Sequence, residues 1–75
     1  MAIVEQRFSG RQLWDARLER KLPRRLVAIA LGVSEQSVLQ WERGVCAPRA
    51  DRVGALASYL ECSIDDLYET VEDDA

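Results

Sequence analysis

The stretch Leu26–Gly44 constrains the fold of this chain more than any other part of its sequence. Its apolar residues Val27, Ala28 and Leu31 fall on one face of a helix. The apolar run stops at Gly32, and glycine can adopt a positive φ at a helix C-terminus without steric cost. The sequence therefore predicts a short helix that is followed at once by a tight turn.

A second helix follows that turn. Ser34 can cap its first turn through the side-chain hydroxyl, and Gly44 is placed to end it. The apolar residues Val38 and Trp41 lie three positions apart and share one face. Two helices joined by a turn of three or four residues that contains glycine are the sequence form of a helix-turn-helix, whose second helix enters the major groove in proteins that bind DNA.

The rest of the chain predicts three more short helices around this pair. Ser9 and Gln12 have the spacing of a capping box at a helix start, and Pro48 permits a new helix one or two residues later. Seventy-five residues make one small domain. We therefore expect an all-α, five-helix domain, with helices over about 10–21, 23–31, 35–43 and 50–61 and a last one after Ser63. We also expect an N-terminal arm over 1–8, the folded DNA-binding unit over 9–70 and an acidic tail over 71–75.

The charges divide the chain into a basic and an acidic part. Residues 1–52 hold all ten Lys and Arg against six acids, a net charge of +4. Residues 53–75 hold seven acids and no base. This distribution predicts one basic face that can meet phosphates and one acidic end that is repelled from DNA.

Composition argues against several other classes of function. No apolar run approaches the ~20 residues of a membrane span, and the N-terminus does not resemble a signal peptide, so we expect a cytoplasmic protein. The chain has no His, and Cys46 and Cys62 lack the spacing of a zinc or redox motif, so we expect reduced thiols, no metal and no cofactor. The sequence also offers no pairing of nucleophile and base and no phosphate-binding glycine loop, so we do not expect an enzyme.

Beyond the motif, the chain resembles the phage repressor and Cro family of DNA-binding domains, also called the XRE type. The resemblance covers about Leu13 to Tyr68. It is carried, in chain order, by Arg17; Val27-Ala28; Leu31-Gly32-Val33-Ser34; Gln36-Ser37-Val38; Trp41-Glu42-Arg43-Gly44; Pro48; Leu56-Ala57; Leu60; Ser63; and Asp65-Asp66-Leu67.

The resemblance implies that the second helix of the motif, about residues 35–43, lies in the major groove of double-stranded DNA. Gln36, Ser37 and Gln40 are then the base-reading residues, and Glu35 lies at the margin of the groove. A glutamine amide can bond both N6 and N7 of adenine, which suits this role.

Four arginines are expected to contact DNA phosphates. Two of them lie in the first turn of a helix, where cations oppose the helix dipole and a bound phosphate would offset that cost. The other two flank the loop after the second motif helix. The four are Arg24, Arg25, Arg43 and Arg49.

Arg17 and Glu42 match a pair that forms a partly buried ion pair in this family. The resemblance implies that the pair ties the first helix to the second helix of the motif. We therefore assign both residues to the architecture and not to base reading.

Two departures from the family pattern concern the phosphate contacts. Arg24 stands where the family usually has Gln, which keeps a phosphate donor and changes its geometry. The loop Val45-Cys46-Ala47 lacks the basic residues often found before the proline. Fewer phosphate contacts predict weaker binding than in a fully basic relative.

A third departure is apolar. Trp14, Leu26 and Ile29 occupy positions that are commonly polar and exposed in this family. Three large apolar groups on adjoining helices can form one patch, and such patches usually mark a surface for a protein partner. The alternative is that residues 1–8 fold back and cover them.

These features predict sequence-specific binding of double-stranded DNA by a small transcriptional regulator of the repressor type, serving a phage, plasmid or bacterial operon. The alternative is a protein-binding module on the same fold, such as an antitoxin or antirepressor-like subunit. Salt-dependent binding to duplex DNA distinguishes the two.

A single module makes few contacts with DNA, so we expect a homodimer on an inverted repeat. Two surfaces compete for the dimer contact. One is the apolar patch described above, and the other is a strip near the acidic end. The strip consists of Tyr59, Leu67, Tyr68 and Val71.

Overall fold

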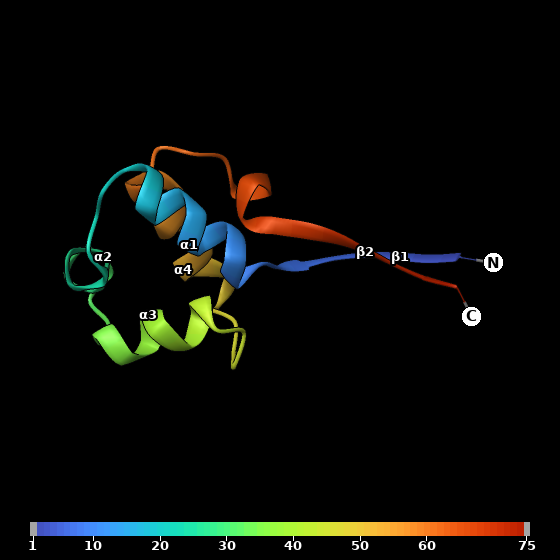
Figure 1. The fold of residues 1–75 in the computed structure, drawn as a ribbon, viewed down its shortest axis with the longest axis horizontal. Coiled ribbons are helices and arrows are strands. Elements are labelled where there is room, and N and C mark those ends of the chain that lie inside the picture. Colours follow the sequence, from blue (N-terminus) through green and yellow to red (C-terminus); the bar gives the residue numbers. More distant parts are fainter. Residues whose placement is uncertain (1, 75) are drawn as a thin grey trace.

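Four α-helices, one short 3₁₀ helix and two β-strands make up residues 2–74, the part of the chain that the computed structural model describes. The strands are the first and last of these elements in the chain, and in Figure 1 they lie side by side and project from one side of the helical body. In chain order the elements are β1 (Ala2–Phe8), α1 (Gly10–Glu19), α2 (Arg24–Leu31), α3 (Glu35–Glu42), α4 (Ala50–Tyr59), the 3₁₀ helix η1 (Ile64–Leu67) and β2 (Tyr68–Asp74).

The turn between α2 and α3 is formed by the residues that predict it. Gly32 ends α2 in the left-handed conformation, with φ 70° and ψ 33°. Most other residues are strained in this region, whereas glycine adopts it at little cost. Ser34 caps α3, because its Oγ accepts a hydrogen bond from the Ser37 amide at 3.1 Å. Helices α2 and α3 therefore form a helix-turn-helix.

The start of α1 is tied to the end of η1. Ser9 Oγ accepts a hydrogen bond from the Gln12 amide at 3.2 Å, as the capping spacing predicts. The Ser9 amide, which a full capping box would pair with the Gln12 side chain, instead donates to the Leu67 carbonyl at 2.8 Å. Residues distant in sequence therefore meet where the two strands leave the helices.

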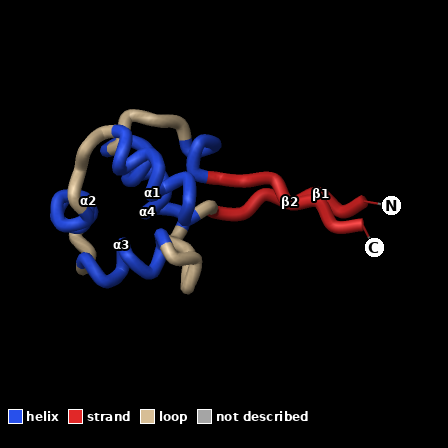
Figure 2. The backbone as a smooth tube through the Cα atoms, in the orientation of Figure 1, coloured by secondary structure: helices blue, strands red, loops and turns tan. Residues whose placement is uncertain are grey.

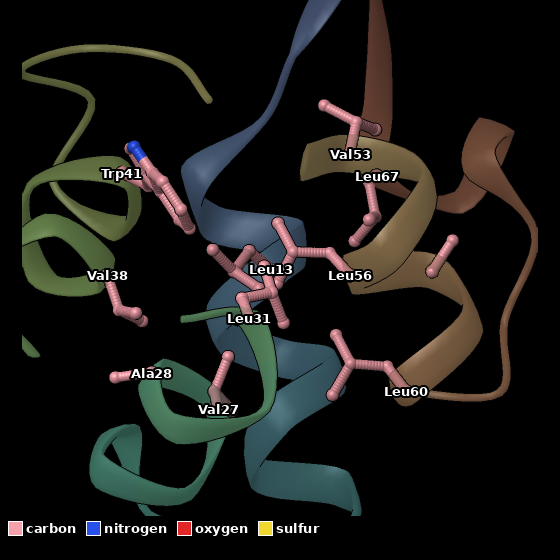
Figure 3. Close-up of a cluster of buried hydrophobic side chains, with 11 residues drawn as sticks. Leu13, Val27, Ala28, Leu31, Val38, Trp41, Val53, Leu56, Leu60 and Leu67 are labelled. Atoms are coloured by element: carbon pink, nitrogen blue, oxygen red, sulfur yellow. The ribbon is translucent and has the colours of Figure 1, made fainter. Parts of the chain in front are cut away.

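One apolar core lies between the helices. Figure 3 shows side chains from α1, α2, α3, α4 and η1 directed toward a common centre. Leu13, Leu56 and Leu67 are fully buried there, and burying a side chain of this size stabilises the fold by about 1.5–3 kcal/mol. The buried apolar set is Leu13, Val27, Ala28, Leu31, Val38, Trp41, Val53, Leu56, Ala57, Leu60 and Leu67.

β1 and β2 form a two-stranded antiparallel ribbon, with a register that runs from Ala2↔Asp74 to Phe8↔Tyr68. At its base the Phe8 and Tyr68 rings meet edge to face, with centroids 6.2 Å apart, and both side chains pack against the core. The rest of the ribbon extends away from the helical body as a separate arm (Figures 1 and 2). It makes the molecule 43 Å long, against 22 and 21 Å across.

The structure confirms a small helical domain around a helix-turn-helix and corrects the expectation of five helices without strands. The fifth expected helix is the four-residue 3₁₀ helix η1, capped by Ser63. Residues 1–8 and 71–75, expected as a free arm and an acidic tail, belong to the ribbon as far as the structure describes them. Local sequence patterns carry no sign of a pairing between the two ends of a chain, so this element was missed.

Helices α1 and α4 are each two residues shorter than expected. Lys21 and Glu61 take positive φ values of 57° and 55° just beyond the two helix ends. The chain therefore turns away before the expected limits at 21 and 61. Leu18 and Ile64 are 47% and 50% exposed.

Candidate nucleic-acid interface

Helix α3 presents the face that the sequence predicts for base reading. Val38 and Trp41 are buried in the core, which fixes the orientation of the helix. Glu35 and Gln36 are consequently exposed, and Gln40 is half-buried. Side chains at i and i+4 share one face of a helix, so Gln36 and Gln40 project to the same side.

Two of the polar side chains on this helix already have partners within the chain. The hydroxyls of Ser34 and Ser37 lie 3.0 Å apart, so Ser37 takes part in capping its own helix. Gln40 Oε1 accepts a weak hydrogen bond from Cys46 Sγ at 3.9 Å. That contact links α3 to the following loop and leaves the Gln40 NH₂ group available as a donor.

A buried ion pair joins α1 to the end of α3. Arg17 Nε and Nη2 donate to the two oxygens of Glu42 at 2.6 and 3.3 Å, and Arg17 Nη1 donates to the Leu22 carbonyl at 2.9 Å. The two side chains are 7% and 3% exposed. A two-pronged contact of this kind restricts both distance and angle, so it holds α3 in one orientation relative to α1.

Arg24 has a partner that the sequence did not predict. Its Nε donates to Glu42 Oε1 at 2.8 Å, so Glu42 binds two arginines. The carboxylate can neutralise only one of them, and the three groups together keep a net positive charge. The Arg24 side chain is 38% exposed and remains open to solvent beside α3.

The other three arginines expected to contact phosphate are exposed. Arg25 lies in the first turn of α2, and Arg43 lies just after α3. Arg49 Nε lies 3.5 Å from Asp51 Oδ1, in a pair whose side chains are 86% and 65% exposed. Such an exposed pair is weak, so Asp51 does little to restrict Arg49.

A hollow between α1, α2 and α3 is lined by Arg11 in addition to Arg24 and Arg43, two of the arginines expected to contact phosphate. It has a volume of about 480 Å³, and three of its lining residues are arginines. The Arg11 guanidinium lies over the Trp14 ring, 4.9 Å from the centroid. The spacing of Arg11 and Trp14, three positions apart on a helix, could have indicated this contact. The lining residues are Arg11, Trp14, Arg24, Leu39, Glu42 and Arg43.

The three residues of the expected apolar patch are not equally exposed. Trp14 is half-buried under Arg11 beside Leu39, and neither Leu26 nor Ile29 lines that hollow. Leu26 and Ile29 remain on the outside of α2, 39% and 69% exposed. The alternative in which residues 1–8 cover them is wrong, because β1 pairs with β2 and extends away from the helices (Figure 1).

The strip expected near the acidic end is only partly exposed. Leu67 is fully buried and Tyr68 is half-buried against the core, whereas Tyr59 is 37% exposed. Two of the four residues proposed for that dimer contact therefore stabilise the domain itself.

Cys46 is exposed and Cys62 is half-buried, and both thiols are free. Burial raises the pKa of the Cys62 thiol, Asp66 raises it further, and Arg20 lowers it.

No group of three or more His, Cys, Asp or Glu in the described residues could hold a metal ion. Within 2–74, every helix is too short or too polar to cross a membrane.

The helix-turn-helix, the buried Arg17–Glu42 ion pair and the arginines around α3 define a class of protein. Residues 15–67 match the model of the helix-turn-helix family, and the chain belongs to that family. The resemblance to the phage repressor and Cro type is thereby confirmed. No curated protein sequence matches the chain.

Several solved structures share the fold. The P22 c2 repressor, crystallised with a synthetic operator, is 30% identical, with a TM-score of 0.75 over 81% of this chain and 92% of that chain. The restriction-modification controller protein C.AhdI from Aeromonas hydrophila is 24% identical, with a TM-score of 0.73 over 77% and 88%. At that identity the likeness shows the fold alone.

A third similar structure is an enzyme. Hydroxypropylphosphonic acid epoxidase from S. wedmorenis is 28% identical, with a TM-score of 0.74 over 80% of this chain. The match covers only 32% of the epoxidase chain, so the likeness concerns one part of that protein.

Proposed function

We propose that this chain is a sequence-specific, double-stranded DNA-binding regulator of the repressor type, without enzymatic activity, that inserts α3 into the major groove. One observation carries the proposal: Gln36 and Gln40 project from the same side of α3, and the buried Arg17–Glu42 ion pair fixes the orientation of this helix. A helix held in this way can present two amides to base edges in a constant geometry. The similarity to the P22 c2 repressor, which was crystallised with an operator, supports this role.

The residues divide into base readers and phosphate binders. Gln36 and Gln40 offer amides that suit adenine, and Ser37 and Glu35 lie beside them on the same helix. Arginines around this helix hold the protein on the DNA backbone through sequence-independent contacts. We assign this role to Arg11, Arg24, Arg25, Arg43 and Arg49.

The functional DNA-binding form is a homodimer on an inverted repeat. One α3 with a few base-reading side chains gives too little contact for the ~10⁻⁸ M affinity of typical specific complexes. Two-fold symmetry places two such helices about 34 Å apart, one turn of DNA. Residues 9–70 form the DNA-binding unit, and the chain acts in the cytoplasm, where phage, plasmid and bacterial operons are transcribed.

Selection of bound sites from a pool of random duplexes tests the proposal. We expect enrichment of one inverted repeat, with half-sites one turn apart, and an affinity that falls steeply as salt is raised. The Gln36→Ala/Gln40→Ala variant is the matched control, since it should keep the salt dependence and lose the enriched sequence. An absence of salt-dependent binding to any duplex would exclude the DNA-binding role.

A second candidate function rests on the exposure of Leu26 and Ile29. Ile29 is 69% exposed and Leu26 39% exposed on α2, and apolar side chains that lie together on a surface can mark a site for a protein partner. In this second function the two side chains bind a protein partner on the side of the domain formed by α2. Leu26→Ser/Ile29→Ser would then abolish partner capture and leave DNA binding unchanged, whereas a DNA-binding defect would assign the pair to the first function.

A further inference from the structure

We propose that two copies of this chain associate through the outer edge of β1, which gives a four-stranded antiparallel sheet in the order β2–β1–β1–β2. The described sheet has only two strands, so each strand has one edge without a partner in residues 2–74. A two-stranded ribbon is marginally stable alone, and an open edge is a template for another strand. The inference names the surface of the proposed homodimer, so its role on DNA rests on the proposed function.

The hydrogen bond at the base of the ribbon identifies which backbone groups face outward. The Ser9 amide donates to the Leu67 carbonyl, and these two residues continue the register of Phe8↔Tyr68. In an antiparallel ladder, hydrogen-bonded pairs alternate with pairs that exchange no bonds. Arg7 and Glu5 therefore turn their backbone groups toward β2, and Gln6 turns its own toward the outer edge.

The charges of β1 select one register for self-pairing. With the two-fold axis at Gln6, Glu5 of each copy faces Arg7 of the other. An axis at Glu5 would place the two Glu5 side chains together, and an axis at Arg7 would do the same with two arginines. Opposite charges directly across a ladder stabilise the pair and like charges destabilise it, so the axis at Gln6 is favoured.

The same register also fits the backbone. Because the outward hydrogen bonds belong to Gln6, the Glu5–Arg7 pairs occupy positions without backbone hydrogen bonds, where facing side chains approach most closely. Both side chains are exposed in the single chain. Arg7 keeps a loose contact with Glu69, at 3.5 Å, and its side chain is 63% exposed.

The edge of β2 opposes self-association. Between residues 68 and 74 the sequence has four acids and no base, whereas β1 has one acid and one base. Pairing two copies of β2 would concentrate eight acidic residues in one sheet. Charged residues on an edge strand are a common protection against such pairing, so the two edges of the ribbon are not equivalent.

The position of the ribbon suits a dimer on DNA. Its base lies beside the C-terminal end of α3, because Arg7 and Phe8 line one hollow with Arg43 and Gly44. Seven residues span about 23 Å, which leaves about 20 Å of the molecular length for the helical body. With the axis at Gln6, the centres of the two bodies lie roughly 35 Å apart, close to one DNA turn.

Charge reversal tests the interface without relying on loss of folding. Glu5→Arg gives a chain with two arginines at the contact, and Arg7→Glu gives a chain with two glutamates. We expect each variant to self-associate at least tenfold more weakly than the unchanged protein in sedimentation equilibrium over a dilution series. We expect an equimolar mixture to recover the dimer, because unlike charges then face each other. Unchanged association of either variant, or a mixture that stays monomeric, would overturn the proposal.

Proline substitution tests which edge is used. Gln6→Pro removes an outward amide of β1, and Thr70→Pro makes the same change on β2 at the residue paired with Gln6. We expect Gln6→Pro to be monomeric and Thr70→Pro to dimerise as before. The reverse result, or equal behaviour of the two variants, would contradict pairing through β1.

The interface and the DNA-binding function can fail separately. Dimers in solution that show no salt-dependent binding to duplex DNA would exclude the function and keep the interface. Specific DNA binding by a chain that stays monomeric both free and on the operator would exclude the interface and keep the function.

Discussion

Arg17 and Glu42 form a two-pronged ion pair, with donor–acceptor distances of 2.6 and 3.3 Å and almost no exposed side-chain surface. The pair joins α1 to the end of α3, and its two residues lie 25 positions apart in the sequence. Its burial makes the loss of one partner costly, because the other charge then remains away from water.

We expect Arg17→Met to lower the free energy of unfolding by about 3 kcal/mol or more. Glu42→Met should also destabilise the fold, because Arg17 and Arg24 both lose their acceptor. The double variant should be less destabilised than the sum of the two single variants. Urea unfolding measures all three, and Arg49→Ala, which removes an exposed pair, is the control with a cost of about 1 kcal/mol or less. Additive effects would mean that the two side chains do not act together.

Gln36→Ala should relax the preference for one base pair in each half-site. A good two-pronged contact between an amide and adenine discriminates by about 1–3 kcal/mol. Competition binding against operators with single base changes measures this loss. Ser58→Ala, at an exposed position on α4, should keep the full preference. A Gln36→Ala variant with undiminished discrimination at every position would remove Gln36 from base reading.

Arg43→Ala should weaken binding to specific and random DNA alike. Loss of one phosphate contact lowers the slope of log K against log salt by about one unit, without a change in base preference. Arg11→Ala should act in the same way if the hollow beside Trp14 receives a phosphate. Arg20→Ala is the control, because Arg20 binds the Leu60 carbonyl and Glu61 instead. A changed base preference with an unchanged slope would contradict the assignment.

Gly10→Ala should destabilise the protein. A Cβ atom at Gly10 would lie 2.6 Å from the Glu42 carbonyl oxygen, and backbone atoms cannot move aside as a flexible side chain can. Gly54→Ala is the matched control, because its Cβ would meet nothing within 4 Å. Since alanine is favoured over glycine inside a helix, Gly54→Ala should stabilise α4 by about 0.5–1 kcal/mol. Thermal unfolding of the two variants should therefore shift in opposite directions.

Iodoacetamide should label Cys46 faster than Cys62. The thiolate is the reactive form, and burial together with Asp66 raises the pKa of Cys62. At a pH below that raised pKa Cys62 stays largely protonated, so its labelling rate should rise steeply only as the pH approaches the raised pKa. Mass spectrometry of Cys46→Ser and Cys62→Ser across a pH series measures each thiol alone. Equal rates at every pH would contradict the burial of Cys62.

The sequence determined the helix-turn-helix and the face it exposes. Gly32 and Ser34 act within a few residues of themselves, so the turn can be read without knowledge of the rest of the fold. The spacing of Val38 and Trp41 identifies the inward face of α3, and Gln36 and Gln40 follow on the other side. Periodicity of this kind is a local property of a helix, which is why the candidate base readers could be predicted.

Tertiary structure alone decided what distant residues do together. The pairing of β1 with β2 joins the two ends of the chain, and no local pattern in the acidic C-terminal segment indicates a partner near the N-terminus. The second arginine on Glu42 depends on the packing of α2 against α3, and the hollow beside Trp14 depends on three helices meeting. Sequence periodicity specifies which face of an element is buried, whereas the partner of that face is set by how all the elements pack into one core.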